Sequence, residues 1–148
     1  MGKRGTVSRL ENVAALQQAA LRFKARDLEG HLKLYSSSVI HHGFSSRIRP
    51  GVAGLKDHYN SLLVGFPDMR VDIDDIIAEG EKVVHRFLFS GTHKGEYLGR
   101  APTGKQVRAA GVHIHLFQGG LAVEVWQILD TFAFLSEIGA VPRLRDAK

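Results

Sequence analysis

Residues 111–130, GVHIHLFQGGLAVEVWQILD, predict the centre of a β-sheet. Two runs rich in β-branched and aromatic residues, 107–117 and 121–131, flank the pair Gly119-Gly120. Glycine tolerates the positive φ angles that the tightest two-residue turns require. The pattern therefore predicts a β-hairpin in which Gln118 faces Leu121.

This register predicts which side chains of the hairpin share a face. With Gln118 opposite Leu121, His113 faces Trp126. Side chains alternate along a strand, so the hairpin has two distinct faces. One face mixes an aromatic with titratable groups, and its members are His113, His115, Glu124, Trp126, Ile128 and Asp130. The other is aliphatic, with Val112, Ile114, Leu116, Val123, Val125 and Leu129. A slip of one residue in the pairing would exchange the two sets.

The two faces predict different neighbours. Ligand sites set a few polar groups among apolar ones, so we expect the mixed face to line a pocket. The helices of the chain can cover only one side of the sheet. We therefore expect the aliphatic face to pack against a second copy of the chain, in a homodimer.

The rest of the chain predicts helices first and strands afterwards. Ser8-Arg9-Leu10-Glu11 has the spacing of a capping box and opens a helix over 8–26. The further elements expected are a short helix after Asp27 that includes Tyr35, a β-type run over 39–42, a helix from 52 that ends at 65–68, strands near 69–74 and 83–91, a long connection over 94–105, and a helical turn over 132–138. Helices followed by consecutive strands indicate an α+β domain with an antiparallel sheet.

Length and composition describe one ordinary domain. Its 148 residues fit a single domain, with flexible tails expected at about 1–6 and 143–148. The absence of cysteine excludes disulfides, thiolate nucleophiles and cysteine-based zinc sites.

No apolar run approaches the roughly 18 residues of a spanning helix, and the basic start lacks the apolar segment of a secretion signal. We expect a cytoplasmic protein with no membrane contact. The net charge of +5 comes largely from the ends rather than from a basic stripe, which argues against nucleic-acid binding.

Four motifs, in order, resemble those of one protein family. They are 66–68 (FPD), 91–96 (GTHKGE) with 102–105 (PTGK), 124–130 (EVWQILD) and 135–139 (LSEIG). From about residue 10 to 142 the chain resembles the SnoaL-like polyketide cyclases, within the nuclear transport factor 2-like superfamily. The resemblance implies a cone-shaped α+β barrel around an apolar pocket, usually dimeric. It also implies ring closure by an intramolecular aldol reaction with no cofactor.

The resemblance also implies where the acid/base lies. The family's aspartate corresponds to Asp130, which would remove a proton α to a carbonyl and later protonate the new alkoxide. From the residues alone, Asp130-Thr131 favours a different role, the cap of the helical turn that follows.

His113 and His115 are further catalytic candidates. They would bind substrate oxygens, polarise a carbonyl or share a proton with Asp130. One alternative is a metal-binding H-x-H pair, but no third or fourth ligand is evident, and we expect no metal. Another is a structural role in which one histidine is satisfied by Glu124.

Five other residues are candidates for contact with the substrate. The resemblance implies that His42 lies in the pocket. His93, in a glycine-flanked turn, either lines the pocket or shapes the loop. Arg86 lies in an apolar strand and, if buried, must meet a pocket carboxylate or the partner subunit. Tyr35 and Trp126 are candidate pocket walls, although such residues more often belong to the core.

These features predict an enzyme that acts on a small hydrophobic carbonyl compound. Polyketide cyclase-like ring closure is the first hypothesis, and isomerases and epoxide hydrolases share the fold. The alternative is a non-catalytic ligand-binding or scaffold domain, because a fold does not settle a function. A carboxylate deep in the pocket would favour the enzyme, whereas an Asp130 that caps a helix at the surface would favour the binding domain.

Overall fold

A computed structural model describes residues 7–45 and 47–141, and the tails expected at 1–6 and 143–148 lie outside the described residues. In chain order its elements are α1 (Arg9–Lys24), α2 (Leu28–Leu32), β1 (Tyr35–His42), α3 (Gly51–Gly65), β2 (Arg70–Glu79), β3 (Lys82–Thr92), β4 (Gln106–Gln118), β5 (Leu121–Leu129) and α4 (Thr131–Glu137). Three helices precede the four long strands, and the expected α+β class is confirmed. Among the described helices, none is long and apolar enough to cross a membrane.

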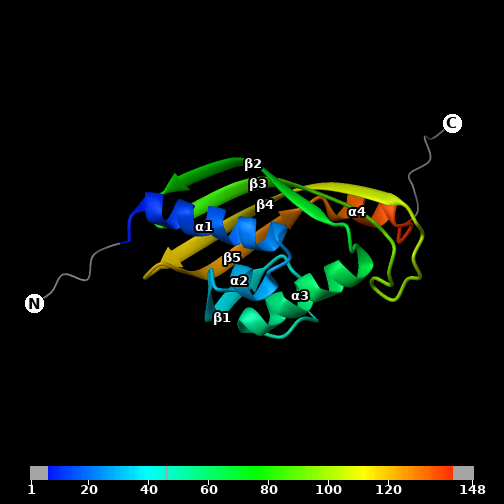
Figure 1. The fold of residues 1–148 in the computed structure, drawn as a ribbon, viewed down its shortest axis with the longest axis horizontal. Helices are drawn as coiled ribbons and strands as arrows, with labels where there is room; N and C mark the ends of the chain where they lie inside the picture. Colours follow the sequence, from blue (N-terminus) through cyan, green and yellow to red (C-terminus); the bar gives the residue numbers. More distant parts are fainter. Residues whose placement is uncertain (1–6, 46, 142–148) are drawn as a thin grey trace, which may run out of the picture.

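The strands form one sheet in the order β1-β5-β4-β3-β2. β2 to β5 pair antiparallel in sequence order, and β1 joins β5 in parallel. The long strands curve, with α1 crossing them and α3 lying beside β1 (Figure 1). α1 contacts β2 and β3, so the helices reach the sheet from both of its edges.

Local signals explain where several elements begin and end. The predicted capping box starts α1: Ser8 Oγ accepts a hydrogen bond from the Glu11 N–H at 3.2 Å, and Glu11 Oε2 accepts one from the Ser8 N–H at 2.6 Å. α2 is shorter than predicted, and Tyr35 opens β1 instead of closing the helix. β2 extends to Glu79 because a bulge lets it continue to pair with β3.

The register of the β4–β5 hairpin holds at its turn and changes beyond it. Gln118 pairs with Leu121, as predicted. Val123 is then an extra residue, so that Leu116 pairs with Glu124. Such a β-bulge adds one residue to one strand and shifts all later pairs.

The bulge makes the predicted faces of β5 wrong. His113 pairs with Gln127 and not with Trp126. The side chains of β5 that share the inner face with His113 are those of Val125, Gln127 and Leu129. Glu124, Trp126 and Ile128 join Val112 and Ile114 on the outer face.

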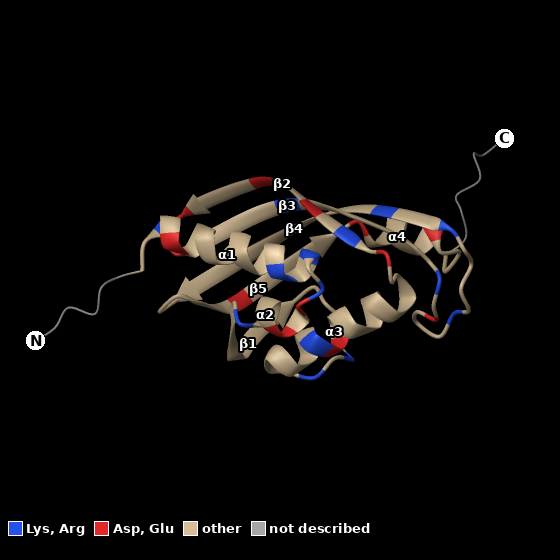
Figure 2. Cartoon of the chain, viewed as in Figure 1, with Lys and Arg blue, Asp and Glu red and all other residues tan. Residues whose placement is uncertain are grey.

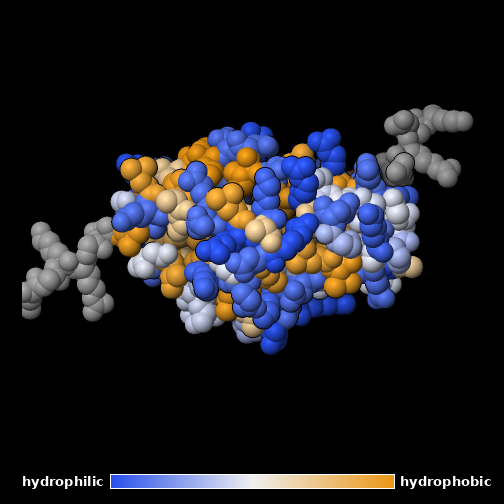
Figure 3. All heavy atoms as spheres, in the orientation of Figure 1, coloured by the Kyte–Doolittle hydropathy of each residue, from blue (hydrophilic) through white to orange (hydrophobic). Residues whose placement is uncertain are grey.

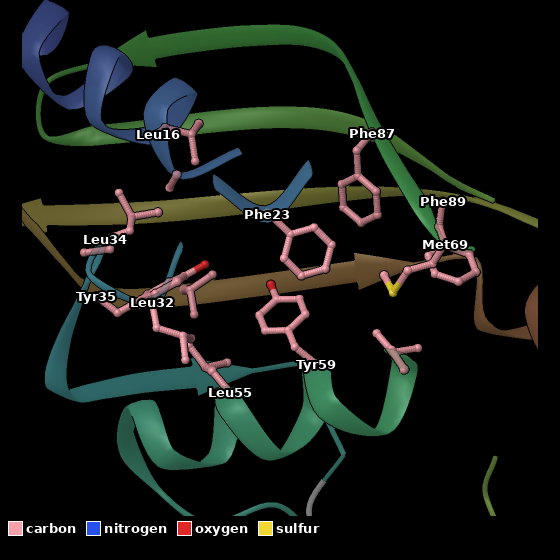
Figure 4. Packing of buried hydrophobic residues seen from close by; sticks show 14 of the residues in the cluster. Leu16, Phe23, Leu32, Leu34, Tyr35, Leu55, Tyr59, Met69, Phe87 and Phe89 are labelled. Atoms are coloured by element: carbon pink, nitrogen blue, oxygen red, sulfur yellow. The ribbon is translucent and has the colours of Figure 1, made fainter. Parts of the chain in front are cut away.

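The inner face of the sheet packs on the helices with aromatic and aliphatic side chains. Along β3, every second side chain from Val83 to Phe89 is buried. Phe23 of α1 and Tyr59 of α3 lie above them, with ring centroids 5.2 Å apart (Figure 4).

Charged side chains lie on the surface. Both signs occur on helices, strands and loops and are interspersed (Figure 2). On the face seen in Figure 3, hydrophilic residues surround smaller hydrophobic patches.

Candidate functional site

A cavity of about 380 Å³ lies between the inner face of the sheet and the helices. α1 and α3 contribute one wall and β2 to β5 the other, while α4 and the loop after β1 border it. Its volume falls in the range of about 300–1,000 Å³ for small-molecule sites. None of the described residues that line it is Asp, Glu, Lys or Arg. The cavity therefore suits an uncharged ligand, because a buried charge needs a partner.

Histidines are prominent in the cavity wall. Five of them line it: His31, His58, His85, His113 and His115. His85 on β3 is the Cα partner of His113 on β4, and His115 follows on the same face. Ring centroids are 4.9 Å apart for His85 and His113, 5.3 Å for His85 and His115, and 5.7 Å for His113 and His115. We call these three residues the histidine cluster.

The hydrogen bonds of the cluster differ from residue to residue. His113 Nε2 donates to Gln127 Oε1 at 2.9 Å. His115 Nε2 lies 3.2 Å from the Tyr35 hydroxyl. The Nδ1 atoms of His85 and His115 are buried, and among the described residues they have no hydrogen-bond partner. The partner that influences which ring nitrogen carries the proton is thus an amide for His113 and a phenol for His115.

Burial keeps these histidines neutral. Burial, with a smaller contribution from repulsion by His85, lowers the pKa of His113 to about 3. Burial also lowers the pKa of His85 and of His58 to about 4. It holds the pKa of His115 well below its usual value. An imidazolium would lose its hydration in the cavity, where none of the described lining residues is a carboxylate.

The buried tyrosines also stay uncharged at neutral pH. Burial raises the pKa of Tyr59 to about 12, and it raises that of Tyr35 well above its usual value. Neutral imidazoles and phenols donate hydrogen bonds to carbonyl oxygens, and an imidazole lone pair accepts a proton. Together these groups are suited to proton transfer on an uncharged compound.

Three of the predicted site residues line the cavity: Tyr35, His113 and His115. His85 and Gln127 also line it, and we did not predict them from the sequence. The alternation of β3 would have indicated His85, because it shares the parity of the buried Phe87 and Phe89. Gln127 had no comparable signal, because the bulge decides its face.

Asp130 lies outside the cavity. Its Oδ1 accepts a hydrogen bond from the Ala133 N–H at 3.0 Å, which makes it the N-cap of α4. The residue is exposed, although its neighbours Leu129 and Thr131 line the cavity. The structure thus places the carboxylate where the sequence alone favoured it, at a helix start.

His42 and Trp126 are corrected to the outer face of the sheet. Their rings stack with centroids 5.2 Å apart, and His42 Nε2 lies 2.7 Å from Glu124 Oε1. The bulge at Val123 and the parallel pairing of His42 with Trp126 bring these side chains together. Glu124 therefore pairs with His42 and does not satisfy a histidine of the cluster.

His93 and Arg86 are also away from the cavity. His93 is fully buried, and its Nδ1 lies 3.0 Å from Thr103 Oγ1, so it shapes the connection after β3. Arg86 is exposed because it alternates with the buried residues of β3. Its guanidinium pairs with Asp74 at 3.4 Å and with Asp75 at 3.8 Å.

A metal site is not formed by the described residues. No group of three or more of their His, Cys, Asp or Glu side chains is arranged to hold a metal ion. The rings of the histidine cluster stack or meet edge to face.

Comparison with known families identifies the class of protein. The model of the SnoaL-like polyketide cyclase family matches residues 13–138, and the chain belongs to this family. A search of curated proteins found no match.

Solved structures share the fold. AclR from Streptomyces galilaeus, described as a "putative hydroxylase", has a TM-score of 0.80 and 28% identity over 91% of this chain and 100% of its own. IdmH from Streptomyces antibioticus, described as a "putative polyketide cyclase", has a TM-score of 0.73 and 25% identity over 86% of this chain and 98% of its own. A SnoaL-like protein from Jannaschia sp. CCS1 has a TM-score of 0.78 and 20% identity over 96% of this chain and 100% of its own, which shows the fold alone.

Proposed function

We propose that this chain is a polyketide cyclase-like enzyme that acts on a small hydrophobic carbonyl compound without a cofactor. The reaction is an intramolecular aldol ring closure or a related proton transfer. The observation that best supports the proposal is the histidine cluster in the wall of a largely apolar cavity. Membership of the SnoaL-like polyketide cyclase family adds support.

His113 is the base in this proposal. Its Nε2 is occupied by Gln127 Oε1, so Nδ1 is the nitrogen left to take a proton from the carbon α to the carbonyl. The pKa of His113 is low, but the enolate formed beside the imidazolium would raise it, because opposite charges stabilise each other. The enolate carbon then forms a bond to the second carbonyl carbon, and the new alkoxide takes the proton back from Nδ1.

Tyr35 is the donor in this proposal. When His115 Nε2–H donates to the Tyr35 oxygen, the Tyr35 O–H exchanges its contact with the Tyr59 side chain for a hydrogen bond to the substrate carbonyl. Negative charge develops on that oxygen only as the enolate forms, so a donor already in place lowers the barrier. The raised pKa of Tyr35 keeps this proton on the phenol at neutral pH.

The exposed position of Asp130 leads us to place the acid/base on His113 instead. The Asp130 carboxylate is engaged with the Ala133 N–H at the start of α4. A group that exchanges a proton with substrate must come within hydrogen-bond reach of it. Asp130 remains the acid/base that the family resemblance implies, and substitution separates the two assignments.

Ligand binding without catalysis is the second candidate function. Two observations favour it: no described residue of the cavity lining is a carboxylate, and Asp130 caps a helix. In this case the neutral histidines and tyrosines would only form hydrogen bonds with ligand oxygens.

We also propose that the chain forms a homodimer through the outer face of the sheet. The bulge changes the membership of this face, which now carries Val84, Leu88, Val112, Ile114, Leu116, Trp126 and Ile128. Ile128 is 64% exposed. Burying apolar surface stabilises an association by about 25 cal/mol per Å² before the costs of binding.

Proton exchange in D2O distinguishes an enzyme from a binding domain. 2-Tetralone is an uncharged bicyclic ketone, and the loss of its α-proton NMR signals reports proton abstraction without knowledge of the natural substrate. The proposal predicts exchange faster than in buffer or with heat-denatured protein. Binding with exchange at the buffer rate would instead support the second candidate. Mass spectrometry of a co-purified ligand would then identify the compound.

A further inference from the structure

Gln127 lies directly across the sheet from His113. The two residues are Cα partners on β5 and β4, and Gln127 Oε1 lies 2.9 Å from His113 Nε2. Both side chains line the cavity. The contact exists because Val123 is bulged, since the unbulged register would bring Trp126 opposite His113.

Neighbouring groups hold both partners in place. The ring centroid of Phe87 lies 4.6 Å from that of His113, and the centroid of Phe44 lies 5.9 Å from it. Gly43 packs against the backbone of Gln127 so closely that a Cβ at Gly43 would overlap the Gln127 carbonyl oxygen. Gly43 also has a φ of +79°, which favours glycine. The absence of a Cβ at Gly43 therefore lets the loop after β1 lie directly against the backbone of Gln127.

The chemistry of the pair determines where the His113 proton lies. A neutral imidazole has one N–H donor and one lone pair, and its partner decides which nitrogen carries the proton. An amide oxygen only accepts, so Oε1 against Nε2 requires Nε2–H and leaves the lone pair on Nδ1. A carboxylate would impose the same tautomer but would also stabilise the imidazolium. The amide fixes the tautomer and leaves the ring neutral.

We infer that Gln127 is a positioning residue that holds His113 as its Nε2–H tautomer and keeps the Nδ1 lone pair available to the ligand. The inference deepens the proposed function and rests on it for its catalytic meaning. The tautomer itself is a property of the protein alone, and it can be measured without turnover.

Nitrogen-15 NMR of the histidine rings in the full chain at pH 7 reads the tautomer. The signals of His113 are assigned by their disappearance in His113→Gln. We expect a protonated Nε2 and an unprotonated Nδ1 in the unsubstituted protein. Gln127→Leu removes the acceptor, so this preference should be lost. In 2-tetralone exchange the same variant should lower kcat about 5- to 10-fold with KM nearly unchanged, the effect of one lost hydrogen bond.

Gln127→Glu tests the electrostatic part of the inference. A carboxylate beside His113 should raise the midpoint of its titration by about 1–3 pH units and shift the pH–rate profile with it. Gln118→Glu places the same charge at the exposed end of β4 and is the matched control. It should leave both the titration and the profile unchanged.

An Nδ1–H tautomer in the unsubstituted protein overturns the inference, and so does an unchanged tautomer in Gln127→Leu. Both results can be obtained whether or not Gln127→Glu folds. The expected tautomer without any exchange activity would contradict the proposed function and leave the positioning by Gln127 in place. Exchange activity with the opposite tautomer would contradict the positioning alone.

Discussion

His85 and His113 face each other across β3 and β4, with ring centroids 4.9 Å apart and ring planes at 87°. His85 is 5% exposed and His113 is 7% exposed. Two imidazoles can lie this close because both are neutral: repulsion from His85 adds to the burial that lowers the pKa of His113. The same relationship makes the stability of the fold depend on pH.

We predict that the protein loses stability as the pH falls from about 6.5 toward 4. An unfolded histidine takes up a proton near pH 6.5, whereas the folded pKa is about 4 for His85 and His58 and about 3 for His113. The unfolded state binds more protons in this window, so each such histidine lowers the free energy of unfolding by about 1.4 kcal/mol per pH unit. Above this window these histidines are neutral in both states. Thermal melting between pH 4 and 8 measures the effect.

A matched pair of variants shows whether the buried histidines cause this loss. His85→Leu removes one buried histidine, so the number of protons taken up on unfolding in this pH window should fall by about one. The slope of the unfolding free energy against pH should decrease in proportion. His42→Gln removes a histidine outside the cavity and should keep the steep dependence. The explanation fails if His85→Leu and the unsubstituted protein show equal slopes.

Asp130 should matter for stability more than for turnover. Its Oδ1 takes the N–H of Ala133, so Asp130→Ala should cost about 0.5–2 kcal/mol of stability, and Asp130→Asn less, since Asn is also a good cap. Denaturant titration of both variants checks this. A loss of turnover of about 10²-fold or more in Asp130→Asn, with unchanged melting, would return the acid/base role to Asp130.

The chain should sediment as a dimer at micromolar concentration. Ile128→Glu puts a charge on the proposed interface, where burial would strip the carboxylate of its hydration, so this variant should be monomeric. Val64→Glu is the control, because Val64 is similarly exposed at 62% but lies on α3. A monomeric unsubstituted chain in analytical ultracentrifugation would rule out the dimer.

We predict that activity requires no metal. Protein purified without an affinity tag should contain less than stoichiometric zinc, iron or manganese by elemental analysis, and a chelator should not change its exchange rate. Stoichiometric metal removed together with activity would mean that the histidine cluster rearranges into a coordination site.

The sequence predicted the fold class because its signals are local and strong. The pair Gly119-Gly120 sets the turn of the hairpin, and Ser8 with Glu11 starts α1. These patterns depend on a few neighbouring residues, so they can be recognised in the sequence without knowledge of tertiary contacts. The family motifs then gave the arrangement of the remaining elements.

The site was predicted only in part, because one bulge decides it. Nothing in the run of apolar residues around Val123 indicates an extra residue, yet the bulge moves Trp126 outward and Gln127 inward. His113 and His115 stayed on the inner face because β4 contains no such interruption. Of the two places expected for Arg86, the alternation of β3 excludes the pocket, because it puts the guanidinium on the outer face of the sheet.

Exchange of the 2-tetralone α-protons by His113→Gln and Asp130→Asn, measured beside the unsubstituted protein, decides between the two acid/base assignments. Gln retains hydrogen-bonding groups but cannot take up the α-proton. We predict that His113→Gln loses about 10²- to 10⁴-fold in exchange rate, while Asp130→Asn keeps nearly full activity and both variants still fold. Full exchange by a folded His113→Gln variant would show that His113 is not the base.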